Sequence, residues 1–465
     1  MRPTRSLLPP IAAVALALPA AAQAEVGSPG LGDPYFPNAG NGGYDVASYD
    51  LDLSYSPKSR KLEGVATISA TAETTLDRFN LDLRPQLEVR SVTVDGAVAS
   101  SEATGDQELE IAPAAPIAAG ATFVTEVAYG GKPKPIKDPD GSSEGWVTTK
   151  DGAYAPNEPQ GSPSWYPCND HPSDKAIFTI SLTVPKGVEA ISNGELAGKS
   201  KHGKLRTWRW QSSEPMATYL AMVAIGHFDI TRSDAAPVPS LFAVDPAIHR
   251  KVKHAKRKLK TLERTPNITR WIAGHAGDYP FGSNGGVVDV VPEVTYALET
   301  QTRPLYTSPP SELLVVHEIA HQWFGDSVTP ANWKEIWLNE GFATYFEFLW
   351  EEERGGQSVA KIFRQLYRTP ADEKDFWNPP PGNPGAAKNL FLHSIYTRGA
   401  MTLQALREKV GDDVFFQILR DWATEHRYGN VTTDDFIALA ERDSGRELGD
   451  LFQVWLFEPG KPEDW

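Results

Sequence analysis

Residues 311–324 read SELLVVHEIAHQWF and follow Ser308-Pro309-Pro310, which is typical of a helix start. In a helix over this stretch, His317 and His321 lie one turn apart on the same face, so both imidazoles can reach one metal ion. Glu318 is displaced by about 100° around the helix axis. It therefore lies beside the metal, where it can hold a water molecule instead of binding the ion.

Catalytic zinc sites use three protein ligands and leave the fourth position to water, so a third ligand is needed. Residues 333–343 read WKEIWLNEGFA and place Glu340 nineteen positions after His321. This spacing lets the first helix end and the chain return antiparallel as a second helix. The pattern HExxH, eighteen residues and Glu predicts one zinc ion per chain, with His317, His321 and Glu340 as ligands and Glu318 as the general base.

The alternative for this helix is a buried segment whose two histidines are satisfied core groups. Two imidazoles and a carboxylate on one apolar helix are costly to bury without a shared partner, so a metal site is the favoured interpretation. The other histidines show no ligand spacing with one another, and we expect them to be structural or exposed: His171, His202, His227, His249, His254, His275, His393 and His426.

The chain has two regions with different patterns of hydrophobic residues. A chain of 465 residues with 40% hydrophobic residues is too long for one compact core, so two domains are expected. Short runs of alternating polarity, such as residues 49–53 and 178–184, predict an antiparallel β domain over residues 44–235. Beyond Pro237 the period lengthens, and residues 236–465 are expected to be mainly helical. The predicted fold is α+β with two domains, with helices near 311–324, 333–353, 395–408, 413–427 and 433–442.

The N-terminus has the pattern of a cleaved signal peptide over residues 1–24. Arg2 and Arg5 precede an apolar run over residues 7–22 and an Ala-Gln-Ala cleavage pattern. An uncleaved membrane anchor is the alternative, but the run is short for a span and prolines interrupt it. Residues 25–43 are rich in Gly, Pro and Asn, and we expect a flexible, exposed leader there. A secreted or extracytoplasmic protein without stable membrane insertion is predicted.

The formal charge of −15, or −17 without Arg2 and Arg5, disfavours nucleic acid or an anionic membrane as the main partner. A basic run over residues 250–260 is either an anion contact or a solvated helix face, and the acidic chain favours the solvated face. The only cysteine is Cys168, so no intramolecular disulfide can form.

The segment from His317 to Glu340, with WFGD at 323–326 and WLNEGFA at 337–343 around the ligands, resembles the aminopeptidase N family of gluzincin zinc peptidases. Further similar segments are found at 49–53, 166–170 and 216–221. The resemblance implies a saddle-like β domain followed by a thermolysin-like catalytic domain. It also implies a zinc aminopeptidase whose substrates are peptides with a free N-terminus.

The resemblance implies roles for residues outside the two helices. Residues 394–400, SIYTRGA, are similar to the family's Tyr-x-Lys-Gly-Ala segment, whose tyrosine donates to the oxyanion. Tyr396 takes that position, and Arg398 replaces the lysine. Residues 296–300, YALET, fall where the family has Gly-Ala-Met-Glu-Asn, which implies that Glu299 binds the α-amine of the substrate.

A second amine-binding group is expected in residues 156–160, PNEPQ. Glu158 has the spacing of the family's second amine-binding position, and Gln160 is the fallback. Two carboxylates around one ammonium would make a peptide hydrolase an exopeptidase, because a mid-chain amide offers no charge to pair. Departures from the family at the first, third and fifth positions of 296–300 leave the shape of the first subsite open.

Other functions remain open at this point. A zinc endopeptidase or an epoxide-opening hydrolase could use the same fold, and a non-catalytic binding module could keep it without activity. Intact ligands, base and tyrosine argue against the binding module. Residues 455–462 resemble the end of the family's catalytic domain, so a short form without the C-terminal helical domain is expected. Its cleft would be more open, or closed by another subunit.

Overall fold

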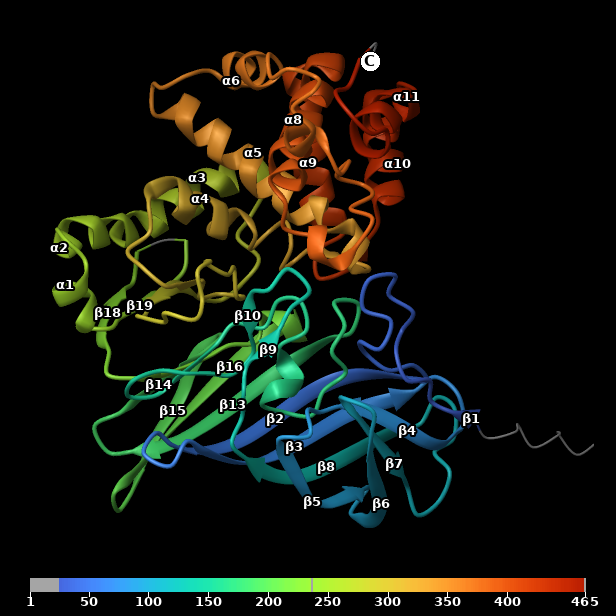
Figure 1. The fold of residues 1–465 in the computed structure, drawn as a ribbon, viewed down its shortest axis with the longest axis vertical. Helices are drawn as coiled ribbons and strands as arrows, with labels where there is room; N and C mark the ends of the chain where they lie inside the picture. The colour runs from blue at the N-terminus through green and yellow to red at the C-terminus, as the bar shows by residue number, and fades with distance from the viewer. Residues whose placement is uncertain (1–24, 236, 464–465) are drawn as a thin grey trace, which may run out of the picture.

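A computed structural model describes residues 25–235 and 237–463 of the chain (Figure 1). A broad layer of strands forms one half of the molecule, and helices form the other half. The two-domain α+β fold predicted from the sequence is confirmed. The predicted signal peptide, residues 1–24, lies outside the described residues.

The main sheet has eleven strands, most of them antiparallel. In spatial order they are β1 (Glu25–Val26), β4 (Leu76–Asp82), β7 (Glu108–Ala112), β6 (Ala97–Thr104), β5 (Leu87–Val94), β8 (Thr122–Gly131), β3 (Lys61–Ala72), β2 (Tyr44–Ser56), β13 (Lys175–Pro185), β16 (Leu205–Ala217) and β15 (Glu195–His202). In β2, Leu51 and Leu53 are buried while Asp50 and Asp52 are exposed, as the alternating pattern predicts.

The sheet is mixed, which differs from the purely antiparallel prediction. β2 and β13 run parallel, with Leu51 opposite Ile180. More than a hundred residues separate these strands in the chain, so no hairpin turn imposes an antiparallel pairing.

Smaller sheets connect the layer to the helices. β9 (Ile136–Lys137) pairs with β10 (Ser143–Glu144), and a four-stranded sheet has the order β11 (Val147–Thr148), β12 (Ala153–Ala155), β17 (Val223–Gly226) and β14 (Glu189–Ser192). A second four-stranded sheet has the order β18 (Asp229–Ser233), β19 (Ser240–Val244), β20 (Asn284–Val288) and β21 (Leu305–Tyr306). β22 (Thr329–Pro330) pairs with β23 (Asn430–Val431). β18 falls inside the range predicted for the β domain, residues 44–235, but it pairs with β19, which lies beyond that range.

Helices make up most of the second half of the chain. They are α1 (Ala247–Lys251), α2 (Ala255–Lys258), α3 (Thr265–Ala276), α4 (Glu312–Ala320), α5 (Trp337–Glu353), α6 (Val359–Leu366), α7 (Lys374–Trp377), α8 (His393–Val410), α9 (Asp412–Glu425), α10 (Thr433–Ser444) and α11 (Gly449–Phe452). Short 3-10 helices are η1 (Ser162–Ser164), η2 (Thr218–Leu220), η3 (Leu259–Arg264), η4 (Trp333–Glu335) and η5 (Ala387–Asn389), and η6 (Gln453–Phe457) is a π-helix.

The helix that carries HExxH begins and ends with local signals. The side chain of Ser311 caps α4 by accepting a hydrogen bond from the backbone N–H of Leu314 at 3.1 Å. The helix ends at Ala320, earlier than the predicted 324, and His321 is its C-cap. Gly325 follows with φ of +138°, a conformation that a side chain would strain, and the chain turns back there.

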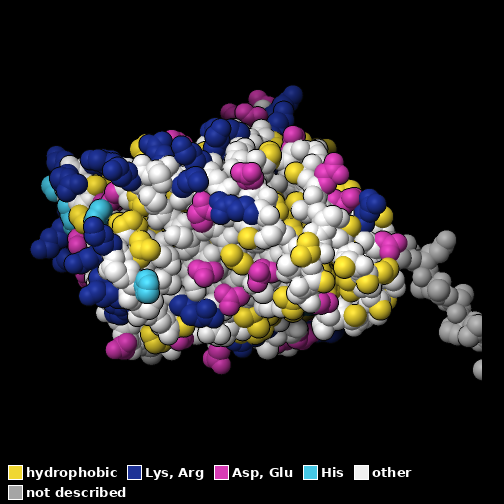
Figure 2. Space-filling model, turned by 90° about the horizontal axis from the view of Figure 1, so that it is seen from below, with side chains coloured by type: hydrophobic (Ala, Val, Ile, Leu, Met, Phe, Trp, Pro, Cys, Tyr) yellow, Lys and Arg dark blue, Asp and Glu magenta, His cyan; other side chains and the backbone are white. Residues whose placement is uncertain are grey.

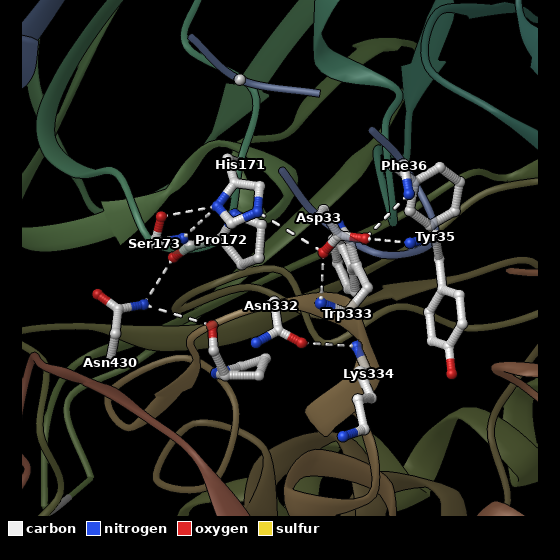
Figure 3. A network of polar contacts seen from close by, with 12 residues as sticks. Asp33, Tyr35, Phe36, His171, Pro172, Ser173, Asn332, Trp333, Lys334 and Asn430 are labelled. Atoms are coloured by element: carbon white, nitrogen blue, oxygen red, sulfur yellow. Dashed lines mark hydrogen bonds and ion pairs between the residues drawn. The ribbon is translucent and has the colours of Figure 1, made fainter. Parts of the chain in front are cut away.

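Residues 25–43 differ from the predicted flexible, exposed leader. They pack along the β domain and reach the helical half of the molecule, where the buried Asp33 accepts a hydrogen bond from the backbone N–H of Trp333 at 2.8 Å (Figure 3). The other carboxylate oxygen of Asp33 accepts from the backbone N–H groups of Tyr35 and Phe36. Polar residues that indicated an exposed loop here make buried hydrogen bonds instead.

The basic run at 250–260 is divided between α1, α2 and the start of η3 rather than forming one helix. Its seven Lys and Arg side chains are exposed, while Ala255 is buried. Figure 2 shows Lys and Arg side chains gathered along the left edge, the side on which Figure 1 places α1 and α2. Within the described residues, no helix has both the length and the apolar character needed to cross a membrane.

Candidate active site

α4 and α5 bring the three predicted metal ligands together. The Nε2 atoms of His317 and His321 lie 3.2 and 3.4 Å from the same carboxylate oxygen of Glu340. One ligand atom from each residue lies within 4.8 Å of the other two. All three side chains are buried. Two imidazoles and one carboxylate converging on one point are a donor set that fits zinc.

The electrostatics of the three residues support a shared cation. Burial opposes ionisation of Glu340, but the neighbouring His321 and His317 outweigh it and hold its pKa at about 2. Glu340 is therefore an anion over the whole physiological range of pH. An ionised carboxylate is the form that binds a metal.

The other ring nitrogens of the two histidines have protein partners. Nδ1 of His317 lies 2.8 Å from a carboxylate oxygen of Glu347, and Nδ1 of His321 lies 3.1 Å from the backbone oxygen of Phe324. Such partners fix the ring orientation and the tautomer, so that Nε2 is free to bind the metal. Sequence reasoning did not single out Glu347. The available signal was its position, two turns beyond Glu340 on the same face of α5.

Glu318 lines the cavity beside the ligands and does not belong to the His317, His321 and Glu340 cluster. Its side chain is 3% exposed, and burial raises the pKa of Glu318 to about 8. A carboxylate that takes up a proton near neutral pH is suited to act as a general base.

A cavity of about 680 Å³ opens over the ligands. Glu158 and Glu299 lie in its wall, and in each carboxylate Oε1 has no hydrogen-bond partner among the described residues. Burial raises the pKa of both groups, and the charge of Glu299 raises that of Glu158 further. Two buried carboxyl groups with unpaired oxygens in one cavity wall could pair with the ammonium group of a ligand.

The fallback residue Gln160 does not line this cavity. Its backbone N–H donates to Glu144 at 3.1 Å, and its side chain borders a different cavity, which contains Glu108. The structure therefore brings Glu158, and not Gln160, into the cavity of the predicted metal ligands.

Tyr396 lies in the first turn of α8 and lines the cavity. Its ring stacks on His317, with ring centroids 6.0 Å apart and planes at 20°. Burial raises the pKa of Tyr396 well above its usual value, so its hydroxyl remains a hydrogen-bond donor.

Comparison with known proteins places this geometry in a family. The model of the peptidase family M1 domain matches residues 288–455, and that of the peptidase M1 N-terminal domain matches residues 143–220. The crystal structure of an M1 zinc metallopeptidase from Deinococcus radiodurans is 30% identical, with a TM-score of 0.83, and the alignment covers 93% of this chain and 99% of that one. The chain belongs to peptidase family M1. A variant of the Deinococcus enzyme, solved with a Tyr-Ser-Ala substrate, is 29% identical with the same TM-score and the same shares covered.

A curated M1 relative is the glutamyl aminopeptidase of Sus scrofa, which is 28% identical over 67% of this chain. The match covers 35% of that protein, so this chain spans about a third of the length of such relatives.

The three residues of segment 296–300 that depart from the family pattern have separate local contacts. The Tyr296 hydroxyl donates to the backbone oxygen of Ser143 at 2.9 Å and so joins the cavity wall to the β domain. Leu298 is buried, and the Thr300 hydroxyl donates to the backbone oxygen of Arg303. Of the three replacements, only Tyr296 lines the cavity.

Proposed function

We propose that this chain is a zinc aminopeptidase that releases N-terminal residues from peptides. The observation that carries the proposal is the pair of buried carboxylates, Glu158 and Glu299, in the same cavity wall as the predicted zinc ligands. A free α-ammonium satisfies both carboxylates, whereas a mid-chain amide leaves them unpaired. The substrate's first peptide bond would then lie over His317, His321 and Glu340.

Each side chain of the site has a separate role in the proposed hydrolysis. When bound, zinc lowers the pKa of a water molecule and polarises the substrate carbonyl. Glu318 accepts the proton of the attacking water and returns it to the leaving amine. Tyr396 donates its hydroxyl hydrogen to the oxygen that gains charge in the transition state. Glu158 and Glu299 hold the ammonium and set the position of the scissile bond.

The exopeptidase claim is tested with matched peptides that have a free or an acetylated N-terminus. Mass spectrometry of the products should show stepwise loss of N-terminal residues from the free peptide and cleavage of the acetylated one at least about 100-fold slower. Glu158→Gln should raise KM for the peptide with a free N-terminus. Its effect on cleavage of the acetylated peptide should be smaller. Equal cleavage of both peptides would favour an endopeptidase.

The mechanism is tested with Glu318→Gln. We expect kcat to fall about a thousandfold, because the base is lost. Atomic absorption should still find one zinc per chain, since the three ligands remain. Glu352→Gln, an exposed change on α5, is the matched control. Near-normal turnover of the Glu318 variant would contradict the assigned base.

We also propose that the protein is secreted or extracytoplasmic. The charged and apolar pattern of residues 1–24 supports this location. Expression of the full chain in the source organism, followed by N-terminal mass spectrometry of the mature protein, tests the proposal. A mature N-terminus at Glu25 is expected, and an intact Met1 in the cytoplasm would contradict it.

A further inference from the structure

Arg398 lies two positions beyond Tyr396 on α8, about 200° around the helix axis from it. The two side chains therefore leave the helix on opposite sides. Tyr396 lines the cavity, whereas Arg398 does not and is completely buried, with 0% of its surface exposed. The proposed mechanism gives Arg398 no contact with substrate or metal.

The guanidinium of Arg398 uses all five of its N–H donors on backbone carbonyls. Nε donates to Trp455 at 2.8 Å, Nη1 to Trp377 at 2.6 Å and Gly460 at 2.8 Å, and Nη2 to Val454 at 2.8 Å and Glu458 at 2.7 Å. Four of the acceptors belong to residues 454–460, which include the end of η6. One side chain thus joins α8 to that segment and to the end of α7.

This arrangement is costly to disturb. Burial lowers the pKa of Arg398 to about 10, so the side chain is still a cation at neutral pH. Within residues 25–235 and 237–463 no carboxylate lies within ion-pair distance of it, so the charge is offset by five carbonyl dipoles and by the more distant charge of Glu458. Each lost hydrogen bond would leave part of a buried charge uncompensated. The guanidinium fork therefore fixes how α8 lies on residues 454–460.

A different side of α8, about 100° around the axis from Arg398, packs against the helix that carries Glu340. α5 and α8 lie side by side in Figure 1, and a Cβ built on Gly399 would be 3.0 Å from the Cα of Gly341. Gly341 directly follows Glu340, and Gly399 directly follows Arg398. The start of α8 is therefore held between this close helix contact and the bonds of Arg398.

We infer that Arg398 is a positioning residue, which holds the start of α8 so that the Tyr396 hydroxyl faces the reacting carbonyl oxygen. The inference rests on the proposed function of Tyr396 as the donor to that oxygen. Lysine could not replace arginine here without loss, because an ammonium offers three donors from one point and cannot reach five carbonyls around a planar group.

Arg398→Lys keeps the charge and removes the fork. A hydroxyl that acts only in the transition state affects kcat and not ground-state binding. We therefore expect kcat to fall about ten- to a hundredfold, because small displacements of catalytic groups have effects of this size. KM should change less than twofold, and the zinc content should stay at one per chain. Arg407→Lys, further along the same helix, is the control and should change none of these values.

A double-mutant cycle separates positioning from a general loss of structure. Tyr396→Phe removes the hydroxyl that Arg398 is inferred to position. In that background, Arg398→Lys should cause no further fall in kcat, because there is no hydroxyl left to misplace. Losses that multiply in the double variant would overturn the inference. If Tyr396→Phe is slow and Arg398→Lys has full turnover, the inference about Arg398 fails and the proposed role of Tyr396 stands. If Tyr396→Phe has full turnover, the proposed role of Tyr396 fails.

A binding measurement keeps the test decisive if Arg398→Lys folds poorly. Arg398→Gln, which retains a planar amide donor, serves as the second variant. A phosphinic peptide, which places an anionic oxygen where the oxyanion forms, should bind to either variant at least about tenfold more weakly. The affinity for a free product amino acid should be unchanged. Equal weakening for both ligands would contradict positioning and indicate a general loss of the site.

Discussion

Glu347 contacts His317, one of the three predicted zinc ligands, and is not itself a predicted ligand. Its carboxylate lies 2.8 Å from Nδ1 of His317, and removing it frees the imidazole ring to rotate. Glu347→Ala should therefore weaken zinc binding about 10- to 100-fold, the usual effect of losing such a partner. Competition with a chromogenic chelator measures the affinity. Glu351→Ala, an exposed change on the same helix, is the control, and equal zinc affinities in the two variants would contradict the assignment.

Lys175 gives the fold a pH dependence of its own. Its Nζ lies 3.0 and 2.9 Å from the backbone oxygens of Asp326 and Ser327 and 2.8 Å from the hydroxyl of Thr329, in the turn after α4. Burial lowers the pKa of Lys175 from 10.5 to about 7. Between these two values the folded state binds fewer protons than the unfolded chain. The contribution of Lys175 to stability is therefore fully present above pH 10.5, its pKa in the unfolded chain. It is lost as the pH falls to about 7, its pKa in the folded protein.

Lys175→Met should remove this slope. The difference between the free energies of unfolding of the wild type and the variant should grow by up to about 1.4 kcal/mol per pH unit from pH 7 to pH 10. Denaturant titrations at several pH values measure both curves. Parallel curves would mean that the pKa of Lys175 is the same in the folded and unfolded chains.

The sequence predicted some site residues better than others for a physical reason. His317 lies in α4 and His321 is its C-cap, so local periodicity alone brings them together, and the next long helix, α5, adds Glu340. Glu158 and Glu299 meet only through the packing of two domains, and no spacing in the sequence reports that contact. Only the family resemblance pointed to those two residues.

At the level of elements, the contact between α5 and α8 depends on two glycines. Gly399→Ala places a methyl group 3.0 Å from the Cα of Gly341, so the helices must separate. We expect a loss of about 1–3 kcal/mol in the free energy of unfolding, as for overpacking in a core. Because the separation also moves Tyr396 from Glu340, kcat should fall. Thermal unfolding and steady-state kinetics measure the two effects.

A second helical glycine provides the control for this prediction. Gly274 lies inside α3, and a Cβ built on it would meet no atom within 4 Å. Gly274→Ala should therefore stabilise the protein by about 0.5–1 kcal/mol and leave kcat unchanged. A loss of stability in both variants would show that backbone conformation, and not the helix contact, sets the cost at Gly399.

The predicted helices differ from the structure where tertiary contacts determine the ends of an element. The basic run at 250–260 was interpreted as one solvated helix face, but His254 has φ of +60° and divides α1 from α2. The predicted helix 311–324 stops at Ala320, because the turn that follows must place the His321 ring against the Phe324 carbonyl. Hydrophobic periodicity predicts which face of an element is buried. It does not predict the residue at which contacts with distant parts of the chain end that element.

For the whole molecule, the relation between the two domains is set partly by residues 25–43. Their Gly, Pro and Asn content is typical of both an exposed linker and a tightly turned, hydrogen-bonded segment, so composition could not distinguish these cases. The segment crosses from the β domain to the start of η4, four residues before the first turn of α5. It therefore connects the domain that carries Glu158 to the helix that carries Glu340.

Asp33 is the residue through which this connection can be tested. Burial raises its pKa, but the contacts with His171 and with three backbone N–H groups outweigh burial and hold the pKa of Asp33 below its usual value. One oxygen lies 2.8 Å from the N–H of Trp333 and 3.6 Å from Nε2 of His171 (Figure 3). Asp33→Asn keeps the shape and one acceptor oxygen but removes the charge. It should lower the free energy of unfolding by about 1–3 kcal/mol, the range for hydrogen bonds to a buried charged group.

The location of the effect distinguishes a connection between domains from a local loop. If Asp33 joins the two domains, hydrogen exchange in Asp33→Asn should speed up both in residues 25–43 and in η4, although the two segments are some 300 positions apart in the chain. Asp106→Asn, in an exposed turn of the β domain, should change neither segment. Faster exchange in residues 25–43 alone would mean that the segment folds on the β domain independently, and that other contacts hold η4 and α5, the helix that follows it.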